Sequence, residues 1–146
     1  MFRSAISAPR LVDADTTMSL VSDPDTPFVE AELRYFTNEP FSVRLSLSLA
    51  ESPSVEWVFA RELLIQGVRL PAGQGDIQIF PIHEGVMIEL HSPDGEAQLL
   101  ADAATLTAFA DAVEAAVPLG QEDRYFSLDA ELADLAVLTG QDTNGH

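Results

Sequence analysis

The stretch VEWVFARELL, residues 55–64, constrains the fold more than any other part of the sequence. In its first half, Val55, Trp57 and Phe59 alternate with Glu, Val and Ala, which is the two-residue period of a β-strand. The second half consists of helix formers, and Gly67 can end a short helix there. A buried Trp or Phe removes about 150–250 Å² from water. We therefore expect a strand that runs directly into a helical turn, with Trp57 and Phe59 at the centre of the core.

Alternating apolar residues predict further strands on both sides of this stretch. Residues 27–37 alternate between apolar and charged types, and residues 41–49 alternate Phe, Val and Leu with Ser and Arg. A short Asn-Glu-Pro break separates them, so they should form an antiparallel hairpin with one wet face. We expect Leu45, Leu47 and Ile79 to join the core. The remaining strands are predicted at residues 16–22, 77–82, 86–91 and 96–100.

The period of the pattern becomes helical after the last predicted strand. Asp102 is a suitable N-cap, and apolar residues that include Phe109 recur at helical spacing on one face. Pro118 and Gly120 should end this helix. A second helix with a leucine stripe is predicted over residues 128–138. About seven strands followed by two C-terminal helices indicate an α+β fold with antiparallel sheets.

The chain of 146 residues is long enough for one domain with its own core. We expect a flexible arm over residues 1–14, a single domain over residues 15–139 and a disordered tail over residues 140–146. The sequence has neither a long apolar run nor a signal peptide, so we expect a cytoplasmic protein with no direct membrane insertion. It has no Cys, which excludes disulfides, thiolate nucleophiles and Cys-ligated zinc.

The charge balance argues against a nucleic-acid partner. The chain contains 24 acidic residues, seven Arg and no Lys, for a net charge of −17. Binding to nucleic acid requires clustered cations that displace counterions from phosphates, and here the arginines are scattered singly. The acidity either keeps the protein soluble or selects a partner that carries a positive patch.

Catalytic residue types occur without a convincing arrangement. His91, Ser92 and Asp94 are the types of a nucleophilic triad, but neighbours in one turn do not have triad geometry. No two His have the spacing of a helical zinc site. Glu30 and Glu32 share one strand face, where ion pairs with nearby Arg are a better interpretation than a cation or glycosidase site. We therefore expect no catalytic residue, no metal and no cofactor. A hydrolase or small-molecule binder that uses His91 or the acidic pairs is an alternative.

Three residues are candidates for contact with other subunits or partners. Arg61 lies where the central strand becomes a helical turn. Its stem should cover the edge of the core while its head pairs with a carboxylate or a carbonyl, and partner binding is the alternative role. Val58 and Phe80 are apolar but lie on the strand faces opposite Trp57 and Ile79. Apolar side chains on both faces of a strand can serve an interface, so Val58, Arg61 and Phe80 are candidate interface residues.

Five segments together resemble the SsgA-like proteins, a family of sporulation and cell-division regulators of filamentous actinobacteria. The resemblance rests on the order and spacing of these segments, and it covers about residues 15–138. The segments are VEWVFARELL at 55–64, GQGDIQIFP at 73–81, SPDGEAQL at 92–99, AAVPLGQE at 115–122 and FSLDAELADL at 126–135.

The resemblance implies a non-enzymatic regulator of cell division and septum formation during sporulation. Such a protein would act as an adaptor that is recruited to the division septum and helps to localise or activate the tubulin-like protein FtsZ. The resemblance also implies a Whirly-like fold, assembly as a homotrimer, and other SsgA-like proteins as partners. Whirly relatives outside the family bind single-stranded nucleic acid. A nucleic-acid-binding module is thus the alternative function, which a net charge of −17 disfavours.

Overall fold

The computed structural model describes residues 10–25, 28–49 and 53–125, and these form eight strands, two α-helices and a short 3-10 helix. No helix in these ranges is long and apolar enough to cross a membrane. The first four strands and the first helix are β1 (Leu11–Leu20), β2 (Phe28–Phe36), β3 (Ser42–Ser48), β4 (Val55–Ala60) and α1 (Arg61–Gly67). The remaining elements are β5 (Ala72–Gln74), β6 (Ile77–Ile82), β7 (Gly85–Ser92), β8 (Gly95–Ala101), α2 (Ala103–Ala116) and η2 (Glu122–Arg124).

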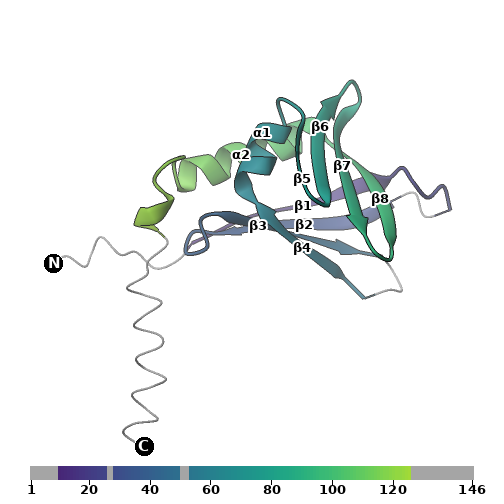
Figure 1. Ribbon diagram of the computed structural model, residues 1–146, viewed down its shortest axis with the longest axis horizontal. Coiled ribbons are helices and arrows are strands. Elements are labelled where there is room, and N and C mark those ends of the chain that lie inside the picture. The colour runs from purple at the N-terminus through teal and green to yellow at the C-terminus, as the bar shows by residue number, and fades with distance from the viewer. Residues whose placement is uncertain (1–9, 26–27, 50–52, 126–146) are drawn as a thin grey trace, which may run out of the picture.

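All eight strands belong to one antiparallel sheet with the order β4-β3-β2-β1-β8-β7-β6-β5. The sheet consists of two four-stranded halves, each connected as a simple meander. Only two residue pairs, Ser19–Leu100 and Leu20–Leu99, join β1 to β8 and so connect the halves. Figure 1 shows how the two halves turn relative to each other, so that the sheet is curled rather than flat.

The sheet differs from the predicted one in three ways. It is a single sheet of eight strands, where antiparallel sheets with about seven strands were expected. The extra strand, β5, lies in a segment rich in Gly and Pro that predicts a loop, and its pairing with β6 makes it a strand. In addition, β1 begins at Leu11, which pairs with Phe36, so regular structure starts inside the predicted arm of residues 1–14.

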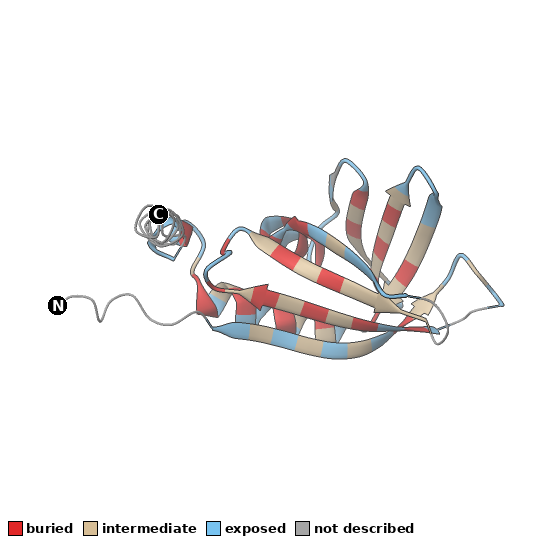
Figure 2. Ribbon diagram, turned by 90° about the horizontal axis from the view of Figure 1, so that it is seen from below, coloured by how far each residue is buried: buried red, intermediate tan, exposed pale blue. Residues whose placement is uncertain are grey.

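One face of the curled sheet carries the core. Figure 2 shows buried positions alternating with less buried ones along the strands, as the two-residue period requires. The residues expected in the core differ in their burial. Leu45 and Ile79 are fully buried, whereas Trp57 is only partly buried and packs at the margin of the core. Of the other expected core residues, Phe59 and Phe109 are buried and Leu47 is partly buried.

Both α-helices lie against the core face of the sheet (Figure 1). α1 follows β4 without a loop, as the sequence predicts, and it ends at Gly67. A Cβ at Gly67 would lie 2.6 Å from the Ile79 Cβ, so only a glycine lets α1 pack this closely on β6. The N-cap of α2 is Asp102, whose carboxylate accepts a 2.9 Å hydrogen bond from the Thr105 N–H. The second helix predicted over residues 128–138 lies outside the described residues.

Candidate functional site

Arg61 is at the centre of a buried polar cluster that joins the sheet to both helices. Its Nη2 donates a 2.7 Å hydrogen bond to Glu122 Oε2, and its Nη1 donates to the Val117 carbonyl and, at 3.3 Å, to the Tyr35 hydroxyl. Longer bonds of 3.4 Å run to the carbonyls of Val113 and Pro118. We call these six residues the Arg61 cluster: Tyr35, Arg61, Val113, Val117, Pro118 and Glu122.

The Arg61 cluster closes the C-terminal end of α2. The last carbonyls of a helix have no partner within the helix and carry partial negative charge, so a buried guanidinium is a favourable cap. Glu122 continues the cap because its Oε1 accepts a 3.0 Å hydrogen bond from the Gly120 N–H. Gly120 has a φ of +87°, a backbone conformation that favours glycine. The sequence Pro118–Glu122 thus folds into a turn that brings one carboxylate onto Arg61.

The pKa values of Glu122 and Tyr35 are shifted by different causes. The hydrogen bond from Arg61, together with backbone N–H donors, holds the pKa of Glu122 below its ordinary value. Burial raises the pKa of the Tyr35 hydroxyl to about 12, although the Arg61 charge acts in the opposite direction. Tyr35 is therefore a neutral donor at physiological pH, and its hydroxyl gives a 2.9 Å hydrogen bond to the Pro40 carbonyl.

The burial of Arg61 corrects the expectation that this residue faces a partner. Its side chain is 1% exposed, and its head pairs with both a carboxylate and carbonyls within the same chain. The structural role considered for Arg61 is the one that the geometry shows. A partner could reach its guanidinium only if the end of α2 opened.

The other two candidate interface residues lie on the outer face of the sheet. Val58 is 56% exposed and is next to Arg44 in the β3–β4 register, whereas Phe80 is partly buried and pairs with Met87. Val58 and Phe80 belong to the edge strand β4 and to β6, which are far apart in the strand order. The outer face therefore does not bring these two residues together through strand pairing.

Ion pairs cross the outer face of β2, β3 and β4, as the alternation of Glu and Arg predicts. Arg34 lies 3.6 Å from both Glu32 and Glu56, and Arg44 lies 2.8 Å from Glu39. These side chains are about one-third or more exposed, so each pair contributes about 0–1 kcal/mol. In the described ranges, no group of three or more acidic or His side chains is arranged to hold a metal ion.

The residues of the possible triad make turn contacts instead. The Ser92 hydroxyl donates to the Gly95 carbonyl and accepts from the Asp94 N–H, and both bonds are local to the β7–β8 turn. The His91 Nδ1 lies 3.6 Å from Glu96 Oε1. None of these contacts pairs a nucleophile with a base, so they do not form a catalytic arrangement.

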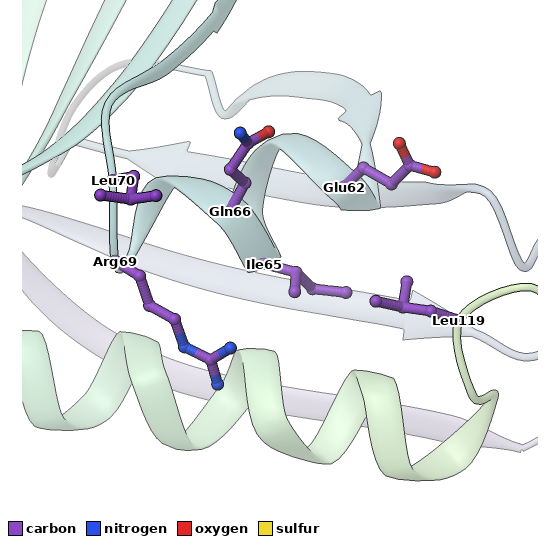
Figure 3. A pocket seen from close by; sticks show the side chains of 6 residues that line it. All are labelled: Glu62, Ile65, Gln66, Arg69, Leu70 and Leu119. Atoms are coloured by element: carbon purple, nitrogen blue, oxygen red, sulfur yellow. The ribbon is translucent and has the colours of Figure 1, made fainter.

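Two hollows on the surface of the described residues bear on a possible binding site. The first has a volume of about 380 Å³ and lies between α1 and the end of α2. Figure 3 shows Ile65 and Leu119 pointing toward each other across it, with Arg69 directed toward α2. The Arg69 side chain is 62% exposed, and its Nη2 lies 3.4 Å from Asp111 Oδ1, so this is a surface ion pair.

The second hollow is larger, about 510 Å³, and lies on the core face of the sheet. No residue of α1 or α2 lines it, so among the described residues it is the part of the core face that these two helices leave uncovered. Trp57 is one of its walls, which explains why this side chain is only partly buried. We call it the open groove, and its lining is Leu20, Val29, Leu47, Leu49, Pro53, Val55, Trp57, Leu90, Ser92, Asp94, Gly95, Glu96, Ala97 and Leu99.

Comparison with known proteins agrees with this fold. The model of the family described as "Streptomyces sporulation and cell division protein, SsgA" matches residues 29–122. The chain belongs to the SsgA family. It is 42% identical over 120 residues to the sporulation-specific cell division protein SsgB of Streptomyces coelicolor, with 80% of this chain and 88% of that protein covered. It is 39% identical over 108 residues to SsgB of Thermobifida fusca, with 71% and 78% covered.

Two solved structures of SsgA-family proteins share the fold. One is the crystal structure of the SsgA-like sporulation-specific cell division protein of Thermobifida fusca, with a TM-score of 0.76 and 34% identity over 88% of this chain and 97% of that one. The other comes from work that correlates mutations in SsgB with longitudinal cell division during sporulation of Streptomyces coelicolor, with a TM-score of 0.74 and 38% identity over 82% and 98%. The chain is thus a sporulation-specific cell division protein of the SsgB type and is not an enzyme.

Sequence reasoning did not find the open groove or the partner of Arg61. The groove depends on where the helices end over the sheet, and alternation along a strand does not report this. Glu122 lies 61 positions from Arg61 in the chain. The available signal was the Pro–Leu–Gly turn before Glu122, which ends the helix and directs the chain back toward α1.

Proposed function

We propose that this SsgA-family protein regulates septum formation during sporulation as an adaptor that helps to localise or activate FtsZ at the division site. The similarity to SsgB over most of both chains carries the proposal. An adaptor requires surfaces rather than chemistry, and the described residues offer apolar and acidic surfaces without a catalytic arrangement. The experiment that tests this function is the position of a fluorescent fusion in sporulating filaments relative to the FtsZ ring.

Protein partners are favoured over nucleic acid for this adaptor. Arg34, Arg44, Arg61 and Arg69 are all engaged in ion pairs with carboxylates of the same chain. Since these pairs neutralise most of the described cations of a strongly acidic chain, the described residues form no basic surface for phosphates. Other SsgA-like proteins and FtsZ are the partners that we propose.

We further propose that the fold is Whirly-like and that the protein assembles as a homotrimer. Val58, exposed on the outer face of edge strand β4, and Phe80 on the outer face of β6 are the positions that we expect at subunit contacts. A ring with threefold symmetry uses two different patches of each subunit, and these two positions belong to separate parts of the sheet.

Size-exclusion chromatography with light scattering tests the assembly. A chain of 15.8 kDa should elute with about three times that mass at micromolar concentration. Val58→Asp should shift the mass toward the monomer because it places a charge at an apolar contact. Leu70→Asp, at another exposed leucine, is the matched control and should leave the mass unchanged. A wild-type protein that remains a monomer at all concentrations would contradict the assembly.

A further inference from the structure

The open groove is an apolar surface that continues the core face of the sheet. Leu20, Leu47 and Leu90 point to the same face as the buried core residues, yet in the described part of the chain they line a hollow that neither α1 nor α2 covers. A volume of about 510 Å³ lies within the range of ligand pockets and accommodates several aliphatic side chains. An apolar concavity of this kind on an adaptor protein favours an apolar occupant.

One wall of the open groove is an edge strand. Val55 and Trp57 line the groove from β4, and β4 is the last strand of the described sheet on its side. Edge strands of natural proteins are usually guarded by Lys, Pro or a bulge. β4 contains neither Lys nor Pro, and its Glu56 is drawn toward Arg34 and Arg44 on the outer face. Its backbone is therefore a template for an added strand, whose alternate side chains would enter the groove.

The rim of the open groove specifies the charge of the occupant. Asp94 and Glu96 are exposed at its edge, and none of its lining residues is Lys or Arg. Charge complementarity favours a segment with cationic residues next to its apolar part. A second copy of this chain is the weaker choice for the groove, since its seven Arg are scattered singly along the sequence and it has no Lys to flank an apolar segment.

We propose that the open groove and the edge of β4 bind an extended apolar segment of a partner protein that is flanked by Arg or Lys. The segment adds to β4 as a further strand, its apolar side chains fill the groove beside Trp57, and its cationic flank pairs with Asp94 and Glu96. This binding site rests on the adaptor function proposed above and identifies a surface through which that function operates.

Synthetic peptides test the site on the purified full chain. The probe is the acetylated, amidated peptide RRVTVTVRR, with EEVTVTVEE and RRVTPTVRR as controls for charge and for strand formation. Trp57 is the only Trp of the protein and lies in the groove, so its fluorescence reports occupancy directly. We expect saturable binding of the Arg-flanked peptide with a blue shift of the Trp57 emission. The affinity of the two control peptides should be lower by about tenfold or more. Added salt should lower the affinity of the Arg-flanked peptide.

Variants separate the parts of the site. Asp94→Asn combined with Glu96→Gln should reduce the preference for the Arg-flanked over the Glu-flanked peptide from about tenfold to about threefold or less. Val55→Asn should lower the affinity for both the Arg-flanked and the Glu-flanked peptide. Leu70→Asn, at an exposed leucine of the other hollow, should leave both affinities unchanged. Circular dichroism of each variant verifies that the sheet is retained.

Three results would overturn the proposed site. The first is a Trp57 emission that does not respond to the Arg-flanked peptide at millimolar concentration. The second is binding of the Glu-flanked or the Pro-containing peptide with the same affinity as the Arg-flanked one. The third is a blue shift of the Trp57 emission when the protein alone is concentrated. The last would assign the groove to a second copy. Because peptide binding uses the isolated protein, its failure leaves septal localisation unaffected, and a protein absent from septa could still bind the peptide.

Discussion

Replacing Arg61 by Ala should lower the free energy of unfolding by about 3–5 kcal/mol, because the change leaves Glu122 as an unpaired buried carboxylate. It also removes the hydrogen bond that the buried Val117 carbonyl, just after α2, accepts from Arg61. A loss of this size is a large part of the total stability of a small domain. Urea denaturation followed by circular dichroism measures it.

Arg69→Ala is the matched control for this prediction. Arg69 also pairs with an aspartate of α2, but its side chain is 62% exposed, and exposed pairs contribute about 0–1 kcal/mol. If the two variants lost equal stability, or if Arg61→Ala kept the stability of the wild type, the Arg61 cluster would not be holding α2 to the sheet.

Acid provides a second measurement of the same cluster. Since the pKa of Glu122 is lower in the folded protein, the stability that it contributes is complete above the ordinary value of 4.5 and is lost as the pH falls through the lowered value. The wild type should therefore lose more stability than Glu122→Gln when the pH is taken below 4.5. Comparing the two removes the contribution of the other acidic residues, which titrate in both proteins.

Phe59→Ala should cost about 3–5 kcal/mol, whereas Trp57→Ala should cost about 1–2 kcal/mol although it removes the larger side chain. Both residues lie on the core face of β4, two positions apart. Phe59 is 7% exposed and buried within the core, but Trp57 borders the open groove and keeps contact with water. Truncating Trp57 therefore enlarges an existing hollow rather than creating a closed cavity.

Denaturation of the two variants under the same conditions measures this difference. Leu45 pairs with Trp57 in the neighbouring strand and is fully buried, so Leu45→Ala should resemble Phe59→Ala at about 2–5 kcal/mol. A Trp57→Ala variant that is as unstable as Phe59→Ala would show that the groove is closed in solution.

Local patterns in the sequence predict most of the fold. Alternation identifies β2, β3, β4 and β7 because one face of each strand packs on the core and the other meets water. The N-cap Asp102 and the helix breaker Pro118 bracket α2, because the first satisfies an N–H of the first turn and the second cannot continue the helix. Local patterns do not predict short strands such as β5, because Ala72–Gln74 is a strand through its pairing with β6 and not through its composition.

The candidate site was less predictable because it depends on contacts between distant parts of the chain. The pattern in β4 shows that Trp57 and Phe59 share a face, but α1 and α2 determine which of them is covered. Likewise, an Arg after a core strand predicts a carboxylate or carbonyl partner, and only the fold brings Glu122 to it. Proposals about interfaces therefore have to begin from the surfaces that the assembled sheet leaves open.

The central claim is that this protein acts at the division septum, and a fluorescent fusion imaged together with FtsZ in sporulating filaments tests it most directly. The fusion should appear as regularly spaced bands at future septa, and it should be present there before the FtsZ ring forms. A fusion that complements loss of the native protein but stays diffuse at every stage of sporulation would contradict the claim.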